Sequence, residues 1–271
     1  MTAAVASALA RAAPPLAPAP APAVDPVAAA LAGHRAVPPE LLARRALLRR
    51  VDTKFAMRAA ALIPLLARLG EAYGVLEAGE ARVATYDTLY LDAPGLPGYL
   101  GHLRGRLPRA KIRIRHYPDR RVSFLEVKRK QHRALTDKVR HPHPFGEDQL
   151  AAAEASWALE RAGWSGDLAP QARTTFRRIT LVGLATDERI TVDLDLRLAL
   201  GTATAALAGL AVVEVKQSRL DHASPAVRAL RAAAAQRLSV SKYAVAMALL
   251  SSQRRNRFLP TLHRLARFQT C

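Results

Sequence analysis

The chain has few cysteines and no long apolar run, and each of these features excludes a class of protein. One of its 271 residues is cysteine, at position Cys271, so no disulfide can form within the chain. A reducing compartment, the cytoplasm, is therefore expected. No apolar run approaches the roughly 20 residues that cross a bilayer, so we expect no transmembrane segment.

Motifs of several common protein classes are also missing. The sequence contains no GxxxxGK[ST] or GxGxxG phosphate loop and no GxSxG nucleophile motif. Aromatic residues make up 5% of the chain, and no basic stretch is interleaved with them as single-stranded nucleic acid binding would require. We therefore expect no nucleic acid partner, although the charge alone would permit one.

Basic residues are abundant, and lysine is rare among them. The 41 Lys and Arg outnumber the 22 Asp and Glu, which gives a formal charge of +19 and favours polyanionic partners. Only seven of the 41 are lysine. A compact ammonium can approach phosphate where the wider guanidinium does not fit, so each lysine marks a candidate phosphate contact. These are Lys54, Lys111, Lys128, Lys130, Lys138, Lys216 and Lys242.

Residues 1–40 differ in composition from the rest. They are mostly Ala and Pro with few large apolar side chains, which predicts a disordered tail before a single domain over residues 41–271. Alternating patterns in that domain predict strands over residues 82–92, 111–116, 121–130, 173–182, 189–196 and 211–217. Helical patterns cover residues 57–73, 149–162, 225–237 and 240–254. With hairpin turns at 117–119 and 185–188, the pattern predicts an α+β fold around an antiparallel sheet or barrel.

Three of the predicted strands carry a charged face. Side chains two positions apart share one face of a strand, so Lys111, Arg113 and Arg115 lie together, opposite Ile112 and Ile114. The same alternation places Glu126 with Lys128 and Lys130, and Glu214 with Lys216. One interpretation is a solvated sheet face, which is common in antiparallel sheets. The other is the interior of a closed barrel, where such faces would bind an anion.

The motifs that carry these residues, taken in series, resemble a known family. VDTKF, TLYLD, KIRIRHY, SFLEVKRK, TDKVR, TFRR, ITVDLDL, VVEVKQ and SVSKY are similar to the motifs of the VTC domain, the polyphosphate polymerase domain of the vacuolar transporter chaperone family. The resemblance spans roughly residues 45 to 265 and suggests a compact bacterial-type member. That family belongs to the triphosphate tunnel metalloenzymes, which are CYTH-like proteins.

The resemblance implies a tunnel of eight antiparallel strands with flanking helices, whose basic interior binds phosphates. Carried over by motif, the catalytic cations would be Lys54, Arg113, Arg115, Lys128, Arg178 and Lys242, with Lys138 and Lys216 also binding phosphate. We add Lys111 and Lys130 to the phosphate-binding set because they lie on the charged faces. A divalent metal, Mn2+ or Mg2+, would bind Glu214, and Glu126 would either assist it or orient nearby cations. Asp193 and Asp195 are predicted to share a strand face. They would either pair with the cations or be ordinary polar residues of a hairpin without a role in the site.

Two departures from the family pattern bear on the reaction. Hydrolytic tunnel enzymes carry a Glu-x-Glu-x-Lys motif, and here Phe124 stands at its first position, which favours phosphate transfer over hydrolysis. The Tyr-x-Arg motif appears as Phe176-Arg177-Arg178 and lacks a hydroxyl. The sequence thus predicts a transferase that extends polyphosphate from ATP. A tunnel triphosphatase and a non-catalytic polyphosphate- or nucleotide-binding module remain alternatives, and the oligomeric state is open.

Overall fold

One large mixed sheet organises the chain in the computed structural model, which describes residues 25–40, 51–77, 81–132 and 136–269. Its strands follow the order β12-β2-β11-β9-β8-β4-β5-β6-β7, with β10 paired to β9, and β3 joining β1 to β8. Every pairing is antiparallel except that of β1 with β3. The predicted α+β class around an antiparallel sheet is confirmed in these terms.

The twelve strands have the following bounds: β1 Ala36–Val37, β2 Val51–Arg58, β3 Tyr73–Leu76, β4 Val83–Asp92, β5 Arg109–Tyr117, β6 Val122–Lys130, β7 Thr136–His143, β8 Ala169–Gly183, β9 Arg189–Leu200, β10 Ala203–Leu207, β11 Leu210–Gln217 and β12 Gln236–Arg237. All six predicted strands are present. Within the described residues no ladder joins β7 to β12 or β2, so the sheet is not closed there. The predicted closed, eight-stranded barrel is therefore not confirmed.

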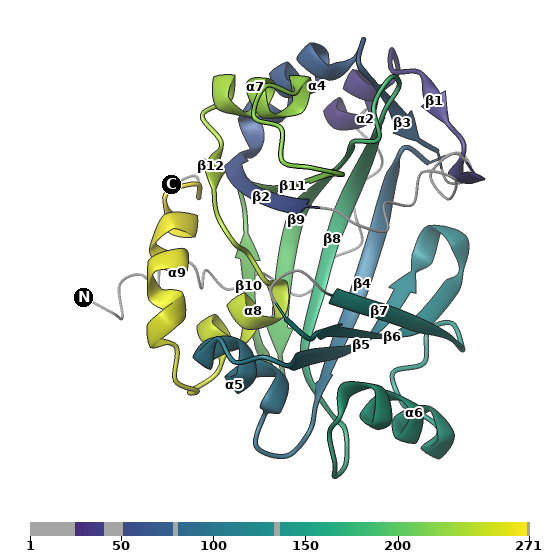
Figure 1. The fold of residues 1–271 in the computed structure, drawn as a ribbon, viewed down its shortest axis with the longest axis vertical. Coiled ribbons are helices and arrows are strands. Elements are labelled where there is room, and N and C mark those ends of the chain that lie inside the picture. The colour runs from purple at the N-terminus through teal and green to yellow at the C-terminus, as the bar shows by residue number, and fades with distance from the viewer. Residues whose placement is uncertain (1–24, 41–50, 78–80, 133–135, 270–271) are drawn as a thin grey trace.

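Helices cover the outer face of the sheet and fill one end of its inner face (Figure 1). Over the outer face lie α2 (Pro26–Leu31), α4 (Leu62–Leu69) and α7 (Pro225–Ala232), packed on apolar residues of β2, β8, β9 and β11. Helix α6 (Ala152–Ala162) covers β5 and β6. The inner face meets α8 (Lys242–Leu250), with α5 (Pro97–Arg104) and α9 (Leu259–Ala266) beside it. The short 3-10 turns are η1 Ala59–Ala61, η2 Pro118–Arg120 and η3 Asn256–Phe258.

The predicted helix over residues 57–73 is wrong at both ends. Its first residues finish strand β2, and only Leu62–Leu69 are α-helical before β3 begins at Tyr73. The alternation of β2 explains this, since Phe55 and Met57 are buried against α4 and α7 while Lys54 lies on the opposite face. The alanines that follow β2 made this stretch look helical from composition.

The predicted disordered tail extends too far toward the domain. Residues 1–24 lie outside the described part of the chain, but Pro26–Leu31 form helix α2 with Asp25 as its N-cap. Strand β1 then pairs with β3, and Leu31 and Val37 are buried. These few apolar residues gain enough burial to order a segment whose overall composition is that of a tail.

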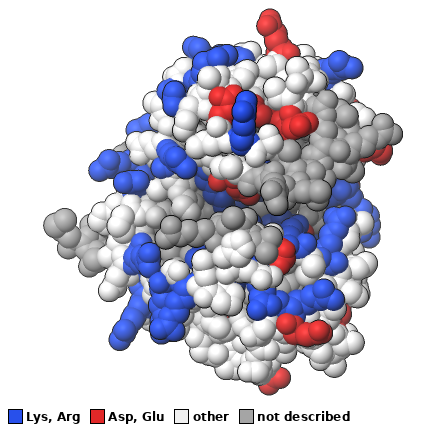
Figure 2. All heavy atoms as spheres, in the orientation of Figure 1, with Lys and Arg blue, Asp and Glu red and all other residues white. Residues whose placement is uncertain are grey.

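The sheet curves so strongly that distant strands face each other. Lys54 of β2 donates to the carbonyl of Val240 at 3.0 Å, and Lys111 of β5 donates to the hydroxyl of the next residue, Ser241, at 2.7 Å. Five strand pairings separate β2 from β5 in the sheet, yet both lysines reach adjacent residues. The inner face is therefore concave, and Figure 2 shows a hollow across the middle of the molecule with charged atoms inside it.

Candidate functional site

The concave face carries nearly all the cations that the sequence singled out. The pairings of β5 with β6 and of β6 with β7 set Lys111 opposite Lys128, and Lys128 opposite Lys138. On the other side of the hollow, Glu214 of β11 pairs with Lys54 of β2. We call this set the ionic face: Asp52, Lys54, Lys111, Arg113, Arg115, Glu126, Lys128, Lys130, Lys138, Arg178, Asp193, Glu214, Lys216 and, from the start of α8, Lys242.

Glu126 is buried beneath three cations. Its Oε2 lies 2.6 Å from Arg113 and 3.8 Å from Arg115, and its Oε1 accepts from Lys138 at 2.5 Å. The carboxylate is only 1% exposed. Burial alone would raise the pKa of Glu126, but the two arginines and Lys138 lower it far below its ordinary range. Because both oxygens are occupied by cations, this geometry favours an orienting role for Glu126 over metal binding.

Asp193 performs the same task for a second pair of cations. Arg178 donates to it through Nε at 2.5 Å and through Nη2 at 2.8 Å, and Lys242 also bonds to it. The ammonium of Lys242 lies 4.3 Å from the ring centre of Phe176, so that ring packs against the cation in place of a hydroxyl. The two arginine bonds and Lys242 hold the pKa of Asp193 well below its ordinary value, against the effect of burial.

The prediction that Asp193 and Asp195 share a face is wrong. The pairing of β8 with β9 shifts register between Thr175 and Arg177, and Asp195 has a positive φ of 52°. This irregularity turns Asp195 outward, where it bonds to Arg177 and is largely exposed. Only Asp193 therefore belongs to the ionic face.

The third cluster lies where β2 and β11 pair. The Lys216 ammonium bridges Glu214 Oε2 at 2.9 Å and Asp52 Oδ2 at 3.1 Å, and Lys54 lies 3.9 Å from Glu214 Oε1. Lys54 and Lys216 lower the pKa of Glu214 to about 2, although burial opposes them. The carboxylate is thus ionised at neutral pH and partly exposed, as a ligand for a hard cation must be.

Lys111 and Lys128 lie in the hollow without a direct ion pair to any residue in the described ranges. Crowding by protein atoms and the nearby Lys54 lower the pKa of Lys128 to about 8, and burial with Lys54 and Lys128 lowers that of Lys111 strongly. Like charges held together without a direct ion pair leave a surplus of positive charge on this part of the face.

This crowding predicts a pH dependence of anion binding. Crowding by protein atoms, which removes water from the ammonium, also lowers the pKa of Lys138 to about 8, so Lys128 and Lys138 are charged below about pH 8 and become neutral above it. The negative charge of inorganic triphosphate does not decrease over this range. We therefore expect the affinity of the protein for triphosphate to fall several-fold between pH 7 and 9, as the lysines lose their positive charge. Calorimetric titration at both pH values measures the change. A Lys128→Arg, Lys138→Arg double variant should flatten the profile, and an unchanged wild-type affinity would contradict the assignment.

Several residues that support the site were not predicted from sequence. Ser241 is the N-cap of α8 and accepts from Lys111, so it links the helix to the sheet. Asp92, fully buried, accepts from the Tyr243 hydroxyl at 2.6 Å and from the backbone of Gly98 and Tyr99. This carboxylate joins the start of α5 to α8 and fixes the helical turn that carries Lys242. Motifs TLYLD and SVSKY contained Asp92 and Tyr243, but nothing in either motif indicated a contact 151 positions apart.

Tyr90 is a further unpredicted member of the ionic face. It pairs with Arg113 in the sheet, is 4% exposed, and stacks on Tyr243 with ring centres 5.0 Å apart. Arg113, Arg115 and Lys242 together lower the pKa of its phenol despite burial. Phe176 has no hydroxyl, but the Tyr90 hydroxyl on strand β4 lies near Lys242, the same cation that packs on the Phe176 ring.

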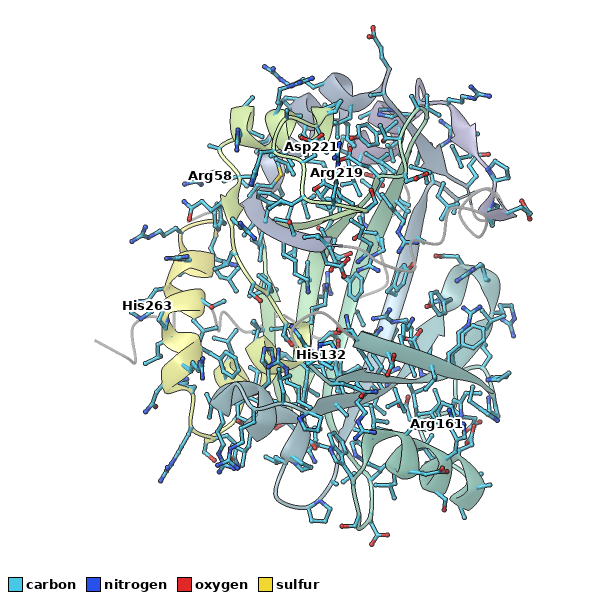
Figure 3. All side chains as sticks on the ribbon, in the orientation of Figure 1. Arg58, His132, Arg161, Arg219, Asp221 and His263 are labelled. Carbon is cyan, nitrogen blue, oxygen red and sulfur yellow. The ribbon has the colours of Figure 1, made fainter. Side chains whose placement is uncertain are left out.

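The side chains of the ionic face come from distant strands of the sheet. In the stick view, His132, just beyond β6, lies near the middle of the molecule (Figure 3). Fold and site together define a curved antiparallel sheet whose inner face gathers cations and the carboxylates that pair with them. The family model for the VTC domain matches residues 49–251, and the chain belongs to this family, as its motifs predicted. The match lies inside the predicted domain of residues 41–271, whose outer limits stay a prediction.

Solved structures with similarity to this chain are distant in sequence. A protein described as a putative adenylate cyclase, from Bacillus halodurans, is 11% identical with a TM-score of 0.49, over 71% of this chain and 94% of that one. One from Hippeastrum, described as a putative adenylyl cyclase with a dominant triphosphatase activity, is 12% identical with a TM-score of 0.45, over 73% and 95%. No curated protein shows significant similarity. No helix in the described ranges is long and apolar enough to cross a membrane.

Proposed function

We propose that this protein is a metal-dependent polyphosphate polymerase, which transfers the terminal phosphate of ATP to a growing polyphosphate chain. The observation that carries the proposal is the ionic face, where crowded lysines and acid-anchored arginines surround one hollow in a member of the VTC domain family. ATP and polyphosphate are the expected partners because both present consecutive phosphates to such a surface.

The reaction needs charge stabilisation more than acid–base help. A terminal phosphate oxygen of the chain is already an anion at neutral pH, and it attacks the γ-phosphorus of ATP as the bond to the β-phosphate oxygen breaks. ADP leaves with the bonding electrons. Arg113, Arg115 and Arg178 are held rigidly by Glu126 and Asp193, so they can stabilise the transferring group without reorganising.

The unpaired lysines have a different task in this mechanism. Lys128 and Lys111 face each other across paired strands, and Lys54 lies close to both. Bound phosphates would restore full charge to these ammonium groups, because an adjacent anion raises a lysine pKa. Binding of a triphosphate is thereby favoured over monophosphate, since only a longer anion contacts several of them together.

The acidic residues fit a divalent metal of the Mn2+ or Mg2+ type only in part. Glu214 and Asp52 both lie within about 3 Å of one ammonium, so the two carboxylates approach the same point. No group of three or more His, Cys, Asp or Glu in the described residues could hold a metal ion. Magnesium commonly uses one or two carboxylates and completes its shell with substrate phosphates, and this donor set allows that arrangement. Such an ion would neutralise charge on the transferring phosphate and the departing diphosphate.

The environment of Phe124 favours transfer over hydrolysis. Its ring lies beneath the guanidinium of Arg140, at 4.8 Å, and edge-on to Tyr117. It shares a strand face with Glu126, whose bonds to Arg113 and Lys138 leave it a poor base. Glu126 therefore has no free oxygen with which to activate a water molecule.

Introducing a carboxylate here is expected to change the product. In Phe124→Glu the new side chain lies on the ionic face opposite Arg115. We expect the ratio of orthophosphate to polymer to rise by about 100-fold, at the lower end of the range for a positioned base. Phe124→Gln, which adds polarity without a charge, is the matched control. Equal ratios in the two variants would show that Phe124 does not control the choice between transfer and hydrolysis.

A turnover assay tests the proposal directly. Purified protein is incubated with ATP and Mn2+, and ADP, orthophosphate and acid-labile polymer are measured together. We expect ADP and polymer in the wild type and a strong loss of both in Lys128→Ala. Binding of triphosphate without any ADP release would instead identify a non-catalytic binding module.

A further inference from the structure

The row of cations on strand β5 continues past the ionic face. Arg115, Arg113, Lys111 and Arg109 alternate along one side of the strand, and Arg109 is the first residue of β5. Arg109 also pairs in the sheet with Lys130, the last residue of β6. Cations therefore extend to the end of the hairpin and out of the hollow at that side.

Beyond this point the row meets the C-terminal segment. Nη1 of Arg257 donates to the carbonyl of Arg104 at 3.0 Å, and the Tyr99 hydroxyl donates to the carbonyl of Arg254 at 2.8 Å. A Cβ at Gly105 would come within 2.7 Å of Arg257 Nη1, so the two segments touch. The turn after α5 and the turn before α9 thus form one surface.

This surface has cations and no nearby acid in its own segments. Residues 93–118 and 222–271 contain no Asp or Glu. Arg104, Arg106, Arg254 and Arg257 are exposed, and Figure 2 shows Lys and Arg atoms gathered at the lower left, over α5 and the C-terminal segment. Burial and then Arg257 lower the pKa of Arg109. Burial, Lys111 and Arg109 lower the pKa of His102 to about 3, so His102 stays neutral. Positive charges therefore lie close enough to repel one another from Lys111 in the hollow, through Arg109, to Arg257 at the surface.

We propose that Arg104, Arg106, Arg109, Arg254 and Arg257 form an arginine track that binds the polyphosphate chain outside the ionic face. The proposal rests on the proposed function, because it takes polyphosphate as the ligand. A chain longer than a few phosphates extends past Lys111 and Arg109 and contacts the track. Long chains are thereby held more tightly than triphosphate, and the growing product stays bound between additions.

The chemistry of the track fits inorganic polyphosphate better than RNA. Single-stranded nucleic acid binding sites usually offer exposed aromatic rings on which bases stack. The aromatic residues of these two turns are Tyr99 and Phe258, and both are buried. A bare phosphate chain needs only cations along its path, and the track begins at the site where phosphates are expected to bind.

Binding measurements on the full chain test the track without requiring turnover. Affinities for inorganic triphosphate and for polyphosphate of about 50 phosphates are measured for the wild type and two variants, Arg106→Gln with Arg257→Gln and Arg104→Gln with Arg254→Gln. We expect each variant to bind the long chain roughly tenfold more weakly, with a shallower salt dependence, and triphosphate within twofold of wild type. The second pair guards against a folding defect from the loss of the Arg257 bond, and thermal unfolding is recorded for both.

The matched control removes the same charge elsewhere. Arg161 on α6 lies across the molecule from α9 (Figure 3), and Arg228 on α7 is also exposed. The Arg161→Gln, Arg228→Gln variant should bind the long chain as the wild type does. An equal loss in this control, or full retention of long-chain affinity in both track variants, would overturn the proposal.

Two further outcomes distinguish an error in the assigned ligand from a failure of the proposed polymerase activity. If single-stranded RNA of matched charge binds the wild type more tightly than polyphosphate, and the track variants abolish that binding, the assignment of polyphosphate is wrong. If the wild type makes no polymer from ATP but the chain-length preference and its loss in the variants hold, the track stands and the polymerase proposal fails.

Discussion

Replacing Glu126 with alanine is expected to lower the free energy of unfolding by about 3 kcal/mol, since removal of one partner from a buried ion cluster leaves its other charges uncompensated. Arg113, Arg115 and Lys138 would lose their shared carboxylate, which is almost fully buried. For a chain of this size the midpoint of thermal unfolding should fall by roughly 6–12 °C. Calorimetry or circular dichroism at pH 7 measures the shift.

The pH dependence of this loss distinguishes the ion cluster from simple packing. The pKa of Glu126 is lowered in the folded protein, so its stabilising effect is complete above its unfolded value of 4.5 and is lost as pH falls below that value. The difference between wild type and variant should therefore shrink in acid. Glu160→Ala, an exposed change on α6, should alter stability by less than about 0.5 kcal/mol. A difference that does not depend on pH would contradict the charge explanation.

Replacing Glu214 with glutamine is expected to reduce ADP release from ATP by about 100-fold or more, in the range found when a stabilising electrostatic group is removed from an active site. The variant keeps the size of the side chain but loses the anion that lies beside Lys216 and Lys54. Lys216 retains its contact with Asp52, so the fold should be little affected. Steady-state rates over a range of Mn2+ concentrations measure the effect.

The matched controls separate metal binding from general damage. If Glu214 holds the ion, the variant should need a higher Mn2+ concentration for half-maximal rate, while triphosphate affinity without metal is kept or improved. Glu160→Gln makes the same chemical change at an exposed position and should leave the rate unchanged. A Glu214→Gln enzyme with wild-type rate and metal dependence would exclude this carboxylate as the metal ligand.

Alternation in the sequence predicted the strands that build the ionic face, because a half-buried strand imposes a period of two on its residues. Strands β5 and β6 and their turn follow directly from KIRIRHYPDRRVSFLEVKRK. Strand β7 has no such apolar alternation. It lies at the sheet edge, where Pro142 costs no ladder bond, so its pattern carried no signal. Local patterns left an open sheet and a barrel as alternatives, and the closed, eight-stranded tunnel was an expectation from the family.

The sequence predicted which residues form the site better than it predicted the contacts that hold them in place. The rarity of lysine and the repeated Glu-Val-Lys motif identified cations that the curved sheet brings onto one face. Asp193 and Asp195 were equivalent in the alternating pattern, and the register shift between β8 and β9, with the positive φ of Asp195, separates them. The anchoring of Lys242 through Tyr243 and Asp92 depends on a contact between distant segments. Such contacts are set by tertiary packing, which a single sequence does not reveal.

The central claim is that the ionic face transfers phosphate to phosphate. ATP labelled with 32P at the γ-position is incubated with the protein and Mn2+, and the label is followed into polymer and orthophosphate. We predict that most of the label enters an acid-labile polymer while ADP accumulates in equal amount, and that Lys128→Ala abolishes both. Label that appears only as orthophosphate, or that stays in ATP, would contradict the claim.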